Sequence, residues 1–251
     1  MLILFSGCSG VGKNTVMNEL MAKNPLLEAY PSYTTRQMRD YESEGNPYHF
    51  VSEKKFCEMR DAGEFFEHEI IHNNMYGTSK KLLEEKLASG KTPIKDIDVY
   101  GARNLKRLLK NEVEIVSIFL YVDSPKTLAE RLTGRGETEI ELRLKRYETE
   151  MEMLPYYDYA INNRNLDETV ELVERIIRFE ENGGVPACEK DFSKLEEEDI
   201  NNYSSILEKG GVLEPVGVKV CENKMTVCDG FERFAAGLKS GETVTRRALL
   251  A

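Results

Sequence analysis

Seven residues near the start of the chain have the spacing of a phosphate-binding loop. Residues 7–13, GCSGVGK, fit the pattern G-x-x-x-x-G-K-[ST] up to its last position. The three glycines let the backbone turn so that its N–H groups point at one anion, and a helix beginning near Lys13 adds the positive end of its dipole. Lys13 supplies a mobile positive charge for the β- and γ-phosphates. The sequence therefore predicts a site for a nucleoside triphosphate.

The last position of the pattern departs from it, because Asn14 stands where a hydroxyl residue usually holds Mg²⁺. The amide oxygen of asparagine is a neutral ligand that can reach Mg²⁺ directly or through water. Mg²⁺ keeps several waters and is held largely by substrate phosphates, so this change leaves the site usable. We expect an active site with Asn14 as a Mg²⁺ ligand, and with Asp96 as a second ligand through water.

Further along the chain, a second group of residues suits a phosphate monoester and a guanine base. Arg36 and Arg39 lie beside hydroxyl residues in SYTTRQMR, and tyrosines follow in YHFV and YGTS. Two arginines and two tyrosine hydroxyls can surround a phosphate monoester. A carboxylate such as those of EFFE accepts hydrogen bonds from the N1–H and 2-amino group of guanine, a donor pair that adenine lacks, while hydroxyls can reach O6 or N7. Taken singly, each of these residues is explained as a solvated arginine or a packed tyrosine.

Taken together, the segments resemble guanylate kinase. The motifs GxSGxGK, SYTTRxxR, YHFV, EFFE, YGTS, DIDVxGA, RLxxRG and DYxxxN follow in the order and spacing of that family, over residues 1 to about 181. The family transfers the γ-phosphoryl group of ATP to GMP with Mg²⁺. The resemblance implies an α/β fold: a P-loop nucleoside monophosphate kinase with a parallel-sheet core, a GMP-binding lobe and a helical lid, followed here by a small α+β domain.

The resemblance also implies a role for each matching residue. The implied GMP-binding residues are Ser32, Arg36, Arg39, Tyr48, Glu67, Tyr76, Thr78 and Asp98. The implied ATP-binding residues are Gly7, Ser9, Gly10, Val11, Gly12, Lys13, Asn14, Thr15, Arg131, Arg135 and Asn163. The implied catalytic residues are Lys13, Arg39, Arg131, Arg135 and Arg143. Phosphoryl transfer needs positioning and charge neutralisation more than covalent chemistry, so arginines converging from several segments are the expected machinery.

Three other features need an interpretation. Lys95 stands where the family usually has an apolar residue, and because burying a lone lysine is costly, we expect it at the rim of the sheet or paired with an acid. Tyr100, which replaces the usual glutamine, is a mild change. His68 and His72 are four apart and would suggest a metal site on a helix, but residues 65–71 predict a strand, which disfavours that site.

Short apolar runs that alternate with amphipathic stretches predict the elements that carry these residues. We expect strands at residues 2–6, 94–99, 114–122 and 158–162, and helices at 13–23, 78–89, 102–110 and 166–181. A further helix begins at Ser124-Pro125, and the charged residues 141–152 predict a solvated lid helix. Strands alternating with helices imply a parallel sheet that binds ligands at the carboxyl ends of its strands.

The run NGGVP at residues 182–186 predicts a linker between a kinase-like domain, residues 1–182, and a small C-terminal domain, residues 183–251. In the latter, strands at 218–222 and 224–228 and a helix after Asp229-Gly230 resemble ParB/sulfiredoxin-like domains. We expect residues 1–182 to be active alone. The alternative is that the tail covers the kinase core or supplies a group such as Arg233, which the helix start would place where anions bind.

Composition limits the class of protein. The chain has 251 residues, 31% of them charged and 41% hydrophobic, as in soluble globular proteins, and its net charge of −10 disfavours nucleic acid and anionic membranes as partners. Five cysteines without C-x-x-C spacing predict reduced thiols. No signal peptide is recognisable, and the longest apolar run is too short to span a bilayer. We expect a cytoplasmic protein whose partners are small-molecule nucleotides.

Two other functions stay open. An inactive guanylate kinase-like binding module would keep the GMP lobe and lose the phosphate loop, but Lys13, the glycines and the lid arginines favour the enzyme. A kinase for a different or modified guanine nucleotide is the other alternative. Glu67 and Asp98 favour guanine and do not exclude a modified one.

Overall fold

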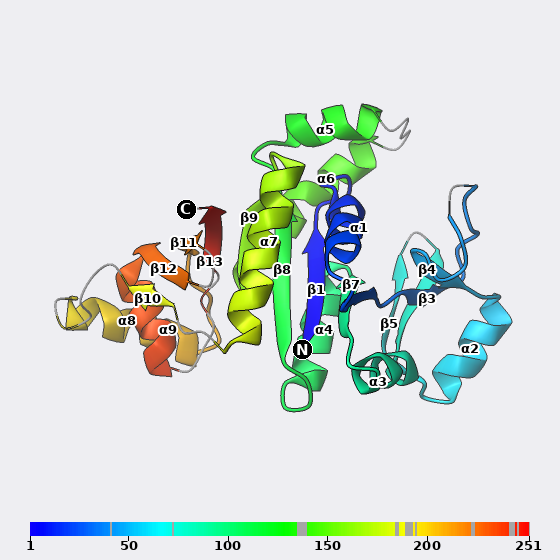
Figure 1. The fold of residues 1–251 in the computed structure, drawn as a ribbon, viewed down its shortest axis with the longest axis horizontal. Helices are drawn as coiled ribbons and strands as arrows, with labels where there is room; N and C mark the ends of the chain where they lie inside the picture. Colours follow the sequence, from blue (N-terminus) through cyan, green and yellow to red (C-terminus); the bar gives the residue numbers. More distant parts are fainter. Residues whose placement is uncertain are drawn as a thin grey trace. The chain divides into compact units, whose positions relative to one another are not determined.

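Helices and strands alternate along most of the chain in the computed structural model (Figure 1). It describes residues 1–40, 42–71, 73–134, 140–183, 186–188, 193, 195–221, 224–240, 244 and 246–250. The chain forms two compact units. The first comprises residues 1–6 and 17–115, and the second comprises residues 7–16 and 116–251.

Three parallel strands form the base of the first unit. Their order is β1 (Leu2–Gly7), β7 (Thr92–Asp96) and β2 (Leu27–Ala29). Residues 2–5 are fully buried, as expected of a parallel strand covered on both faces. The helices α1 (Lys13–Lys23), α3 (Lys80–Ala88) and α4 (Val99–Leu109) each follow a strand in the chain, and the first turn of α1 belongs to the second unit.

The first unit also contains a separate four-stranded sheet, on which most of the expected GMP-binding residues lie. Its order is β4 (Tyr48–Phe50), β3 (Ser32–Thr34), β6 (Asn74–Ser79) and β5 (Phe65–Ile71), with only β3 and β4 parallel. Helix α2 (Glu53–Asp61) packs Phe56 and Met59 against Phe65. This small apolar cluster anchors the sheet that carries the site.

The second unit begins with the phosphate loop and continues from residue 116. The parallel strands β8 (Ile115–Tyr121) and β9 (Tyr159–Asn162) lie next to each other. Between them the chain forms α5 (Pro125–Gly134) and α6 (Ile140–Met151), which contact each other, and a 3₁₀ turn at Leu154–Tyr156. Helix α7 (Leu166–Glu181) follows β9, and the side chain of Asn165 caps it by accepting from the N–H of Glu168.

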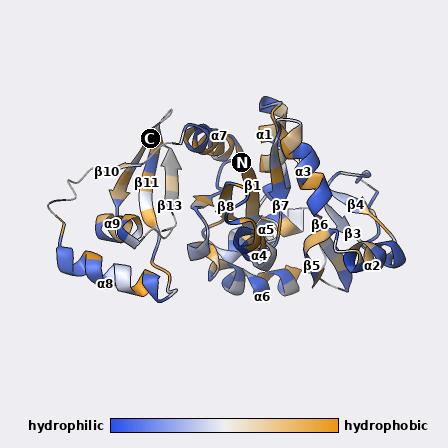
Figure 2. Cartoon of the chain, turned by 90° about the horizontal axis from the view of Figure 1, so that it is seen from below, coloured by the Kyte–Doolittle hydropathy of each residue, from blue (hydrophilic) through white to orange (hydrophobic). Residues whose placement is uncertain are grey.

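The C-terminal part of this unit adds four strands and two helices among its described residues. They are β10 (Ala187–Cys188), α8 (Glu197–Glu208), β11 (Val216–Cys221), β12 (Lys224–Asp229), α9 (Phe231–Ser240) and β13 (Arg246–Leu250). Most residues of α8 are hydrophilic (Figure 2). Strand β13 pairs in parallel with β11 on one side and with β9 on the other, so the tail continues the sheet of β8 and β9.

One partly buried polar cluster joins this added part to the preceding residues. The Arg246 guanidinium lies 2.9 Å from Glu180 Oε1 and donates to the Tyr159 hydroxyl at 2.5 Å. The Tyr159 hydroxyl in turn donates to Glu180. Arg246 and Glu180 are each about one-fifth exposed, so water screens their attraction only partly.

The predicted elements agree with the structure except at some of their ends. Helices at 13–23 and 166–181 and the strand at 65–71 have the predicted bounds. The helix predicted from residue 78 begins at Lys80, because Thr78 and Ser79 complete β6 and the Ser79 hydroxyl accepts from the N–H of Leu82. The strand predicted to reach residue 99 ends at Asp96, because Asp98 caps α4. Among the described residues, no helix is both long and apolar enough to cross a membrane.

Candidate active site

Glycine is required at two positions of the phosphate loop. Gly7 and Gly12 have φ values of 135° and 103°, which side chains rarely allow. A Cβ atom at Gly7 would lie 1.9 Å from the carbonyl oxygen of Leu120, and one at Gly12 would lie 2.8 Å from Asn163 Nδ2. The loop therefore has its shape because neighbouring strands and side chains press directly against its backbone.

Side chains of the second unit hold the loop in place. Lys13 Nζ donates to the carbonyl oxygen of Gly7 at 2.8 Å. Asn163 is buried and its Nδ2 donates to the carbonyl oxygen of Val11 at 2.7 Å, while Arg131 Nη1 donates to the same oxygen at 3.1 Å. Asn163 was expected to bind ATP, which stays a prediction, and its amide nitrogen also supports the loop. Asn14 and Thr15 are exposed on the first turn of α1.

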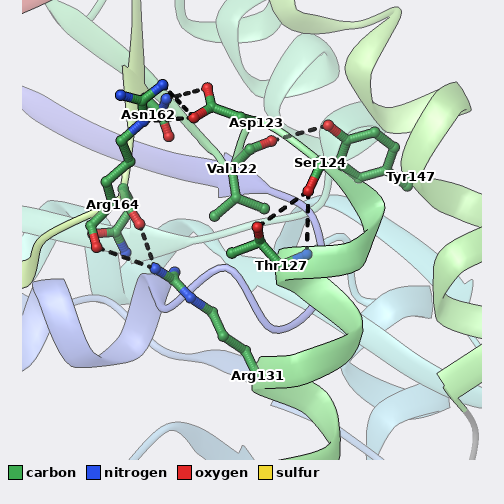
Figure 3. Close-up of polar contacts among 9 residues, drawn as sticks. Val122, Asp123, Ser124, Thr127, Arg131, Tyr147, Asn162 and Arg164 are labelled. Carbon is green, nitrogen blue, oxygen red and sulfur yellow. Dashed lines mark hydrogen bonds and ion pairs between the residues drawn. The ribbon is translucent and has the colours of Figure 1, made fainter.

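Two of the three expected lid arginines reach the loop or the segment beside it. Arg131 on α5 donates to the carbonyl oxygens of Asn163, at 2.7 Å, and Arg164, at 3.4 Å (Figure 3). Arg143 on α6 donates to the hydroxyl of Ser9. The hydroxyl of Tyr147 anchors α6 by donating to the carbonyl oxygen of Val122 at 2.9 Å (Figure 3). The third arginine, Arg135, lies outside the described residues.

In the first unit, three of the four expected ligands of a phosphate monoester come together, and the backbone of the fourth, Arg39, is held by a nearby carboxylate. The Arg36 guanidinium lies over the ring of Tyr48, 5.3 Å from its centroid, and the rings of Tyr48 and Tyr76 meet edge to face at 5.5 Å. Glu42, which sequence analysis missed, organises the arginines. It accepts from Arg36 Nη2 at 2.6 Å and from the backbone N–H of Arg39 at 2.8 Å.

The charge of Glu42 is stabilised by these contacts. Burial alone would raise its pKa, but the hydrogen bonds from Arg36 and from the Arg39 backbone outweigh burial and lower it. The pKa of Tyr48 is raised by burial and by the negative charge of Asp96, so its hydroxyl stays protonated and can donate. A pair of arginines and a phenolic donor suits a phosphate dianion.

The expected guanine contacts form a row across the small sheet. Glu67 on β5 pairs with Thr78 on β6, and the Thr78 hydroxyl donates to Glu67 Oε1. The register that pairs Tyr33 with Gly77 places Ser32 on β3 one step further, beside Thr78. An irregularity between Phe65 and Glu67 alters the side-chain alternation of β5 at this point. A carboxylate and two hydroxyls thus lie in one row.

Comparisons with known proteins give a consistent result. The family model for guanylate kinase matches residues 1–180. The chain is 40% identical to the guanylate kinase of Bartonella henselae over 70% of this chain and 79% of that protein, and 37% identical to that of Clostridioides difficile over 72% and 89%. The crystal structure of guanylate kinase from Anaplasma phagocytophilum has a TM-score of 0.58 at 31% identity, covering 72% of this chain and 85% of that one.

The chain belongs to the guanylate kinase family. Its activity is the ATP-dependent phosphorylation of GMP, and the predicted α/β nucleotide kinase fold is confirmed. The family match ends at residue 180, so the C-terminal part from residue 181 onward lies outside it. The resemblance of that part to ParB/sulfiredoxin-like domains stays a prediction.

For this guanylate kinase, one sequence expectation about the GMP side needs correction. Lys95 does not lie at the rim of the sheet, because its side chain is fully buried. Its Nζ donates to Ser32 Oγ at 2.6 Å and to the carbonyl oxygen of Tyr30 at 3.4 Å, and lies 4.6 Å from the centroid of the Tyr30 ring. Burial lowers the pKa of Lys95 to about 8, although the negative charges of Glu67 and of two aspartates act to raise it. A hydroxyl, a carbonyl and a ring thus replace the expected ion pair.

Asp98 has a structural role in addition to its expected contact with guanine. Its Oδ1 accepts from the N–H groups of Tyr100, at 2.9 Å, and Gly101, at 3.1 Å, which caps helix α4. Oδ2 is left for other partners. The start of α4 therefore fixes this carboxylate near the guanine row.

Glu150 lies beside the phosphate loop, and sequence analysis missed it. It lies on α6, it is only 9% exposed, and its carboxylate accepts hydrogen bonds from the Cys8 thiol and the Ser9 backbone N–H of the loop. Burial raises the pKa of Glu150, while the positive charge of Lys13 opposes this. Burial and the nearby Glu150 raise the pKa of the Cys8 thiol to about 12. The signal in the sequence was the spacing, since Arg143 and Glu150 are seven residues apart and share a helix face.

The residues present fit a Mg²⁺ ion that is held mainly by phosphates. Among the described residues, no group of three or more His, Cys, Asp or Glu side chains is arranged to hold a metal. Mg²⁺ in kinase sites usually needs only one or two protein ligands, with water and phosphate oxygens supplying the rest. The exposed amide of Asn14, next to Lys13, meets that modest requirement.

Proposed function

We propose that this guanylate kinase recognises GMP with the small sheet of the first unit and ATP with the loop and lid of the second. The observation that carries the proposal is the row of Ser32, Thr78 and Glu67. The carboxylate of Glu67 accepts from the N1–H and the 2-amino group of guanine. Adenine presents no such pair of donors there, so the row selects guanine.

The GMP phosphate binds to Arg36, Arg39, Tyr48 and Tyr76. Glu42 holds the Arg36 guanidinium and the backbone of Arg39 at fixed positions. Groups that are ordered before binding lose less conformational entropy when the ligand arrives, so Glu42 strengthens phosphate binding without touching the nucleotide. Asp98 supplies the remaining guanine contact.

On the ATP side, the loop N–H groups and Lys13 bind the β- and γ-phosphates. A phosphate oxygen of GMP attacks the γ-phosphorus of ATP, the bond to the β-phosphate oxygen breaks, and ADP leaves. Arg131 and Arg143, with Arg135, neutralise the charge that spreads over the transferring group. Asn163 acts indirectly by holding the loop.

Mg²⁺ accompanies ATP, with Asn14 as a ligand and Asp96 as a ligand through water. When bound, the ion neutralises phosphate charge. We further propose that the enzyme acts in the cytoplasm on free nucleotides, which its net charge of −10 supports.

We propose a domain boundary near residue 182, with residues 183–251 forming a C-terminal domain. The end of the family match at residue 180 supports it. Limited proteolysis should cut between Asn182 and Cys188. The fragment is then assayed beside the full chain, and a loss of activity beyond about tenfold in a folded fragment would mean that both parts work as one enzyme.

A coupled ADP-release assay with ATP, Mg²⁺ and each nucleoside monophosphate tests the proposed specificity. GMP should be turned over with the highest kcat/KM, and AMP, CMP and UMP should be poor substrates. Turnover of none of them would refute the proposal. The alternative of a modified guanine substrate is favoured only if GMP is phosphorylated more slowly than a guanine nucleotide altered at N7 or on the sugar.

A further inference from the structure

Lys95 lies beside the proposed guanine site, and the proposed mechanism gives it no role. It is fully buried on β7, and its nearest polar contact is Ser32 Oγ at 2.6 Å. A buried ammonium without a function is costly, since hydrophobic side chains of similar size fill the same space at less cost. Its contact with a guanine-site hydroxyl therefore calls for a functional explanation.

The direction of the hydrogen bonds supplies that explanation. An ammonium group has donors and no acceptor, so Ser32 Oγ must accept from Lys95. The hydrogen of the Ser32 hydroxyl is then free to donate to another atom. In the same row, the Thr78 hydroxyl already donates its hydrogen to Glu67. Of these two hydroxyls, Ser32 is the one that can donate to the base.

We propose that Lys95 is a positioning residue that fixes Ser32 as a hydrogen-bond donor and so selects nucleotides with an acceptor at position 6 of the purine. The inference rests on the proposed recognition of GMP and deepens it. Guanine carries a carbonyl oxygen at that position, whereas adenine carries an amino group that donates. A hydroxyl whose hydrogen points at the base therefore favours O6 of guanine, which accepts that hydrogen, over the amino group of adenine, which cannot accept it.

The charges around Lys95 are consistent with this role. Glu67 and Asp98, the two carboxylates expected at the base, and Asp96 at the end of β7 all interact with its positive charge. Lys95 thus balances carboxylates that accept from the N1 and 2-amino side while it directs a donor to the O6 side. Acceptors facing N1–H and the 2-amino group, with a donor facing O6, match the hydrogen-bonding pattern of guanine.

The test compares wild type with Lys95→Met, which keeps the length of the side chain and removes its donors. Three substrates separate the contacts: GMP, inosine monophosphate, which keeps O6 and lacks the 2-amino group, and 6-thio-GMP, whose sulfur is a weak acceptor. We expect KM to rise about tenfold for GMP and for inosine monophosphate, with little change for 6-thio-GMP and in kcat. Lys86→Met is the matched control, because Lys86 is also a buried lysine of this unit but bonds to Glu28.

Equal losses for all three substrates, or no loss for any, would overturn the inference and leave the proposed function intact. Failure of the wild type to phosphorylate GMP would overturn both. If Lys95→Met does not fold, Ser32→Ala is the decisive variant. It keeps Lys95, and it must raise KM for GMP and inosine monophosphate but not for 6-thio-GMP. If both variants fold, the double variant Lys95→Met and Ser32→Ala should raise the KM for GMP, relative to that for 6-thio-GMP, no more than Ser32→Ala alone does.

Discussion

In the proposed function, the two units of this enzyme recognise their ligands by different physical means. In the first, side chains from neighbouring strands form the guanine row, and each has a defined partner: Thr78 for Glu67 and Lys95 for Ser32. In the second, a glycine-rich backbone forms the phosphate site, and side chains such as Asn163 and Arg131 hold that backbone from outside. A base is identified by its edge, which requires side chains of fixed donor and acceptor character, whereas any phosphate can be held by N–H groups.

The two sites also place their lysines differently. Lys95 is fully buried, and burial lowers its pKa to about 8. Lys13 lies at the start of a helix, and its amino group spans the loop to the carbonyl oxygen of Gly7. In the proposed mechanism, the first lysine orients the Ser32 hydroxyl and the second follows the transferring phosphoryl group. Substitutions in the two units should therefore affect specificity and rate separately.

The largest effect is expected at the loop. Lys13→Met removes the charge that follows the transferring phosphoryl group, and should lower kcat about 1000-fold while the ratio of GMP to AMP turnover changes little. Steady-state kinetics measure both quantities, and circular dichroism checks the fold. Lys23→Met, at the exposed end of the same helix, is the control and should be neutral. A large change in the ratio of GMP to AMP turnover would contradict the proposal that the second unit sets the rate and the first unit sets base specificity.

The second prediction concerns stability in the C-terminal part. Arg246→Met leaves the carboxylate of Glu180 without its guanidinium partner, and should lower the free energy of unfolding by about 3 kcal/mol. Urea unfolding measures the change. Arg164→Met, which breaks an exposed pair with Asp123, should cost less than about 1 kcal/mol. The double variant Arg246→Met and Glu180→Met should recover most of the loss, and its failure to do so would point to packing instead of charge.

Third, Glu67→Gln should reduce kcat/KM for GMP about 30-fold and that for AMP much less. The amide keeps one acceptor and adds a donor, so one donor of guanine is left unpaired in the site. Glu64→Gln, an exposed change just before the same strand, serves as the control. Equal losses of kcat/KM for GMP and AMP would contradict the assignment of Glu67 to the guanine site.

The fourth prediction is a pH dependence of GMP binding. Burial raises the pKa of Glu67, and the Thr78 hydrogen bond and the charge of Lys95 only partly oppose this, while Asp98 and Glu69 add to it. As the pH falls, Glu67 is protonated earlier than an ordinary carboxyl group, so the KM for GMP should rise on the acid side of neutrality. Glu67→Gln should abolish that rise. The same shift means that Glu67 contributes less to stability as the pH rises through its raised pKa.

The smallest effect is expected at Asn14. Asn14→Ser restores a hydroxyl ligand and should lower the Mg²⁺ concentration needed for half-maximal rate about threefold, with the KM for GMP nearly unchanged. A titration of activity against Mg²⁺ at fixed ATP measures the shift. A change in GMP affinity without a change in metal dependence would contradict our assignment of the loop to ATP.

Features that depend on local spacing were predictable from the sequence. The helix at Lys13–Lys23 follows directly from the loop, and Leu166–Glu181 has a capping residue and a regular apolar face, so both were predicted with correct bounds. The burial of Lys95 was not predictable, because its cost is offset by Ser32 and Tyr30, more than 60 positions away. Glu42 and Glu150 were missed for a related reason: a carboxylate in a charged, polar segment looks solvated until the partners across the fold are known.

The pairing of β13 with β9 has a consequence for how the chain folds. Arg246 and Tyr159 are 87 positions apart. The ribosome therefore releases β9 long before the strand that will cover it, and the intervening helices and strands must emerge first. During that interval β9 has one uncovered edge, which can pair with the same strand of another nascent chain. We expect refolding at high protein concentration to give exchanged dimers in which β13 of one chain completes the sheet of another, and dilution to suppress them.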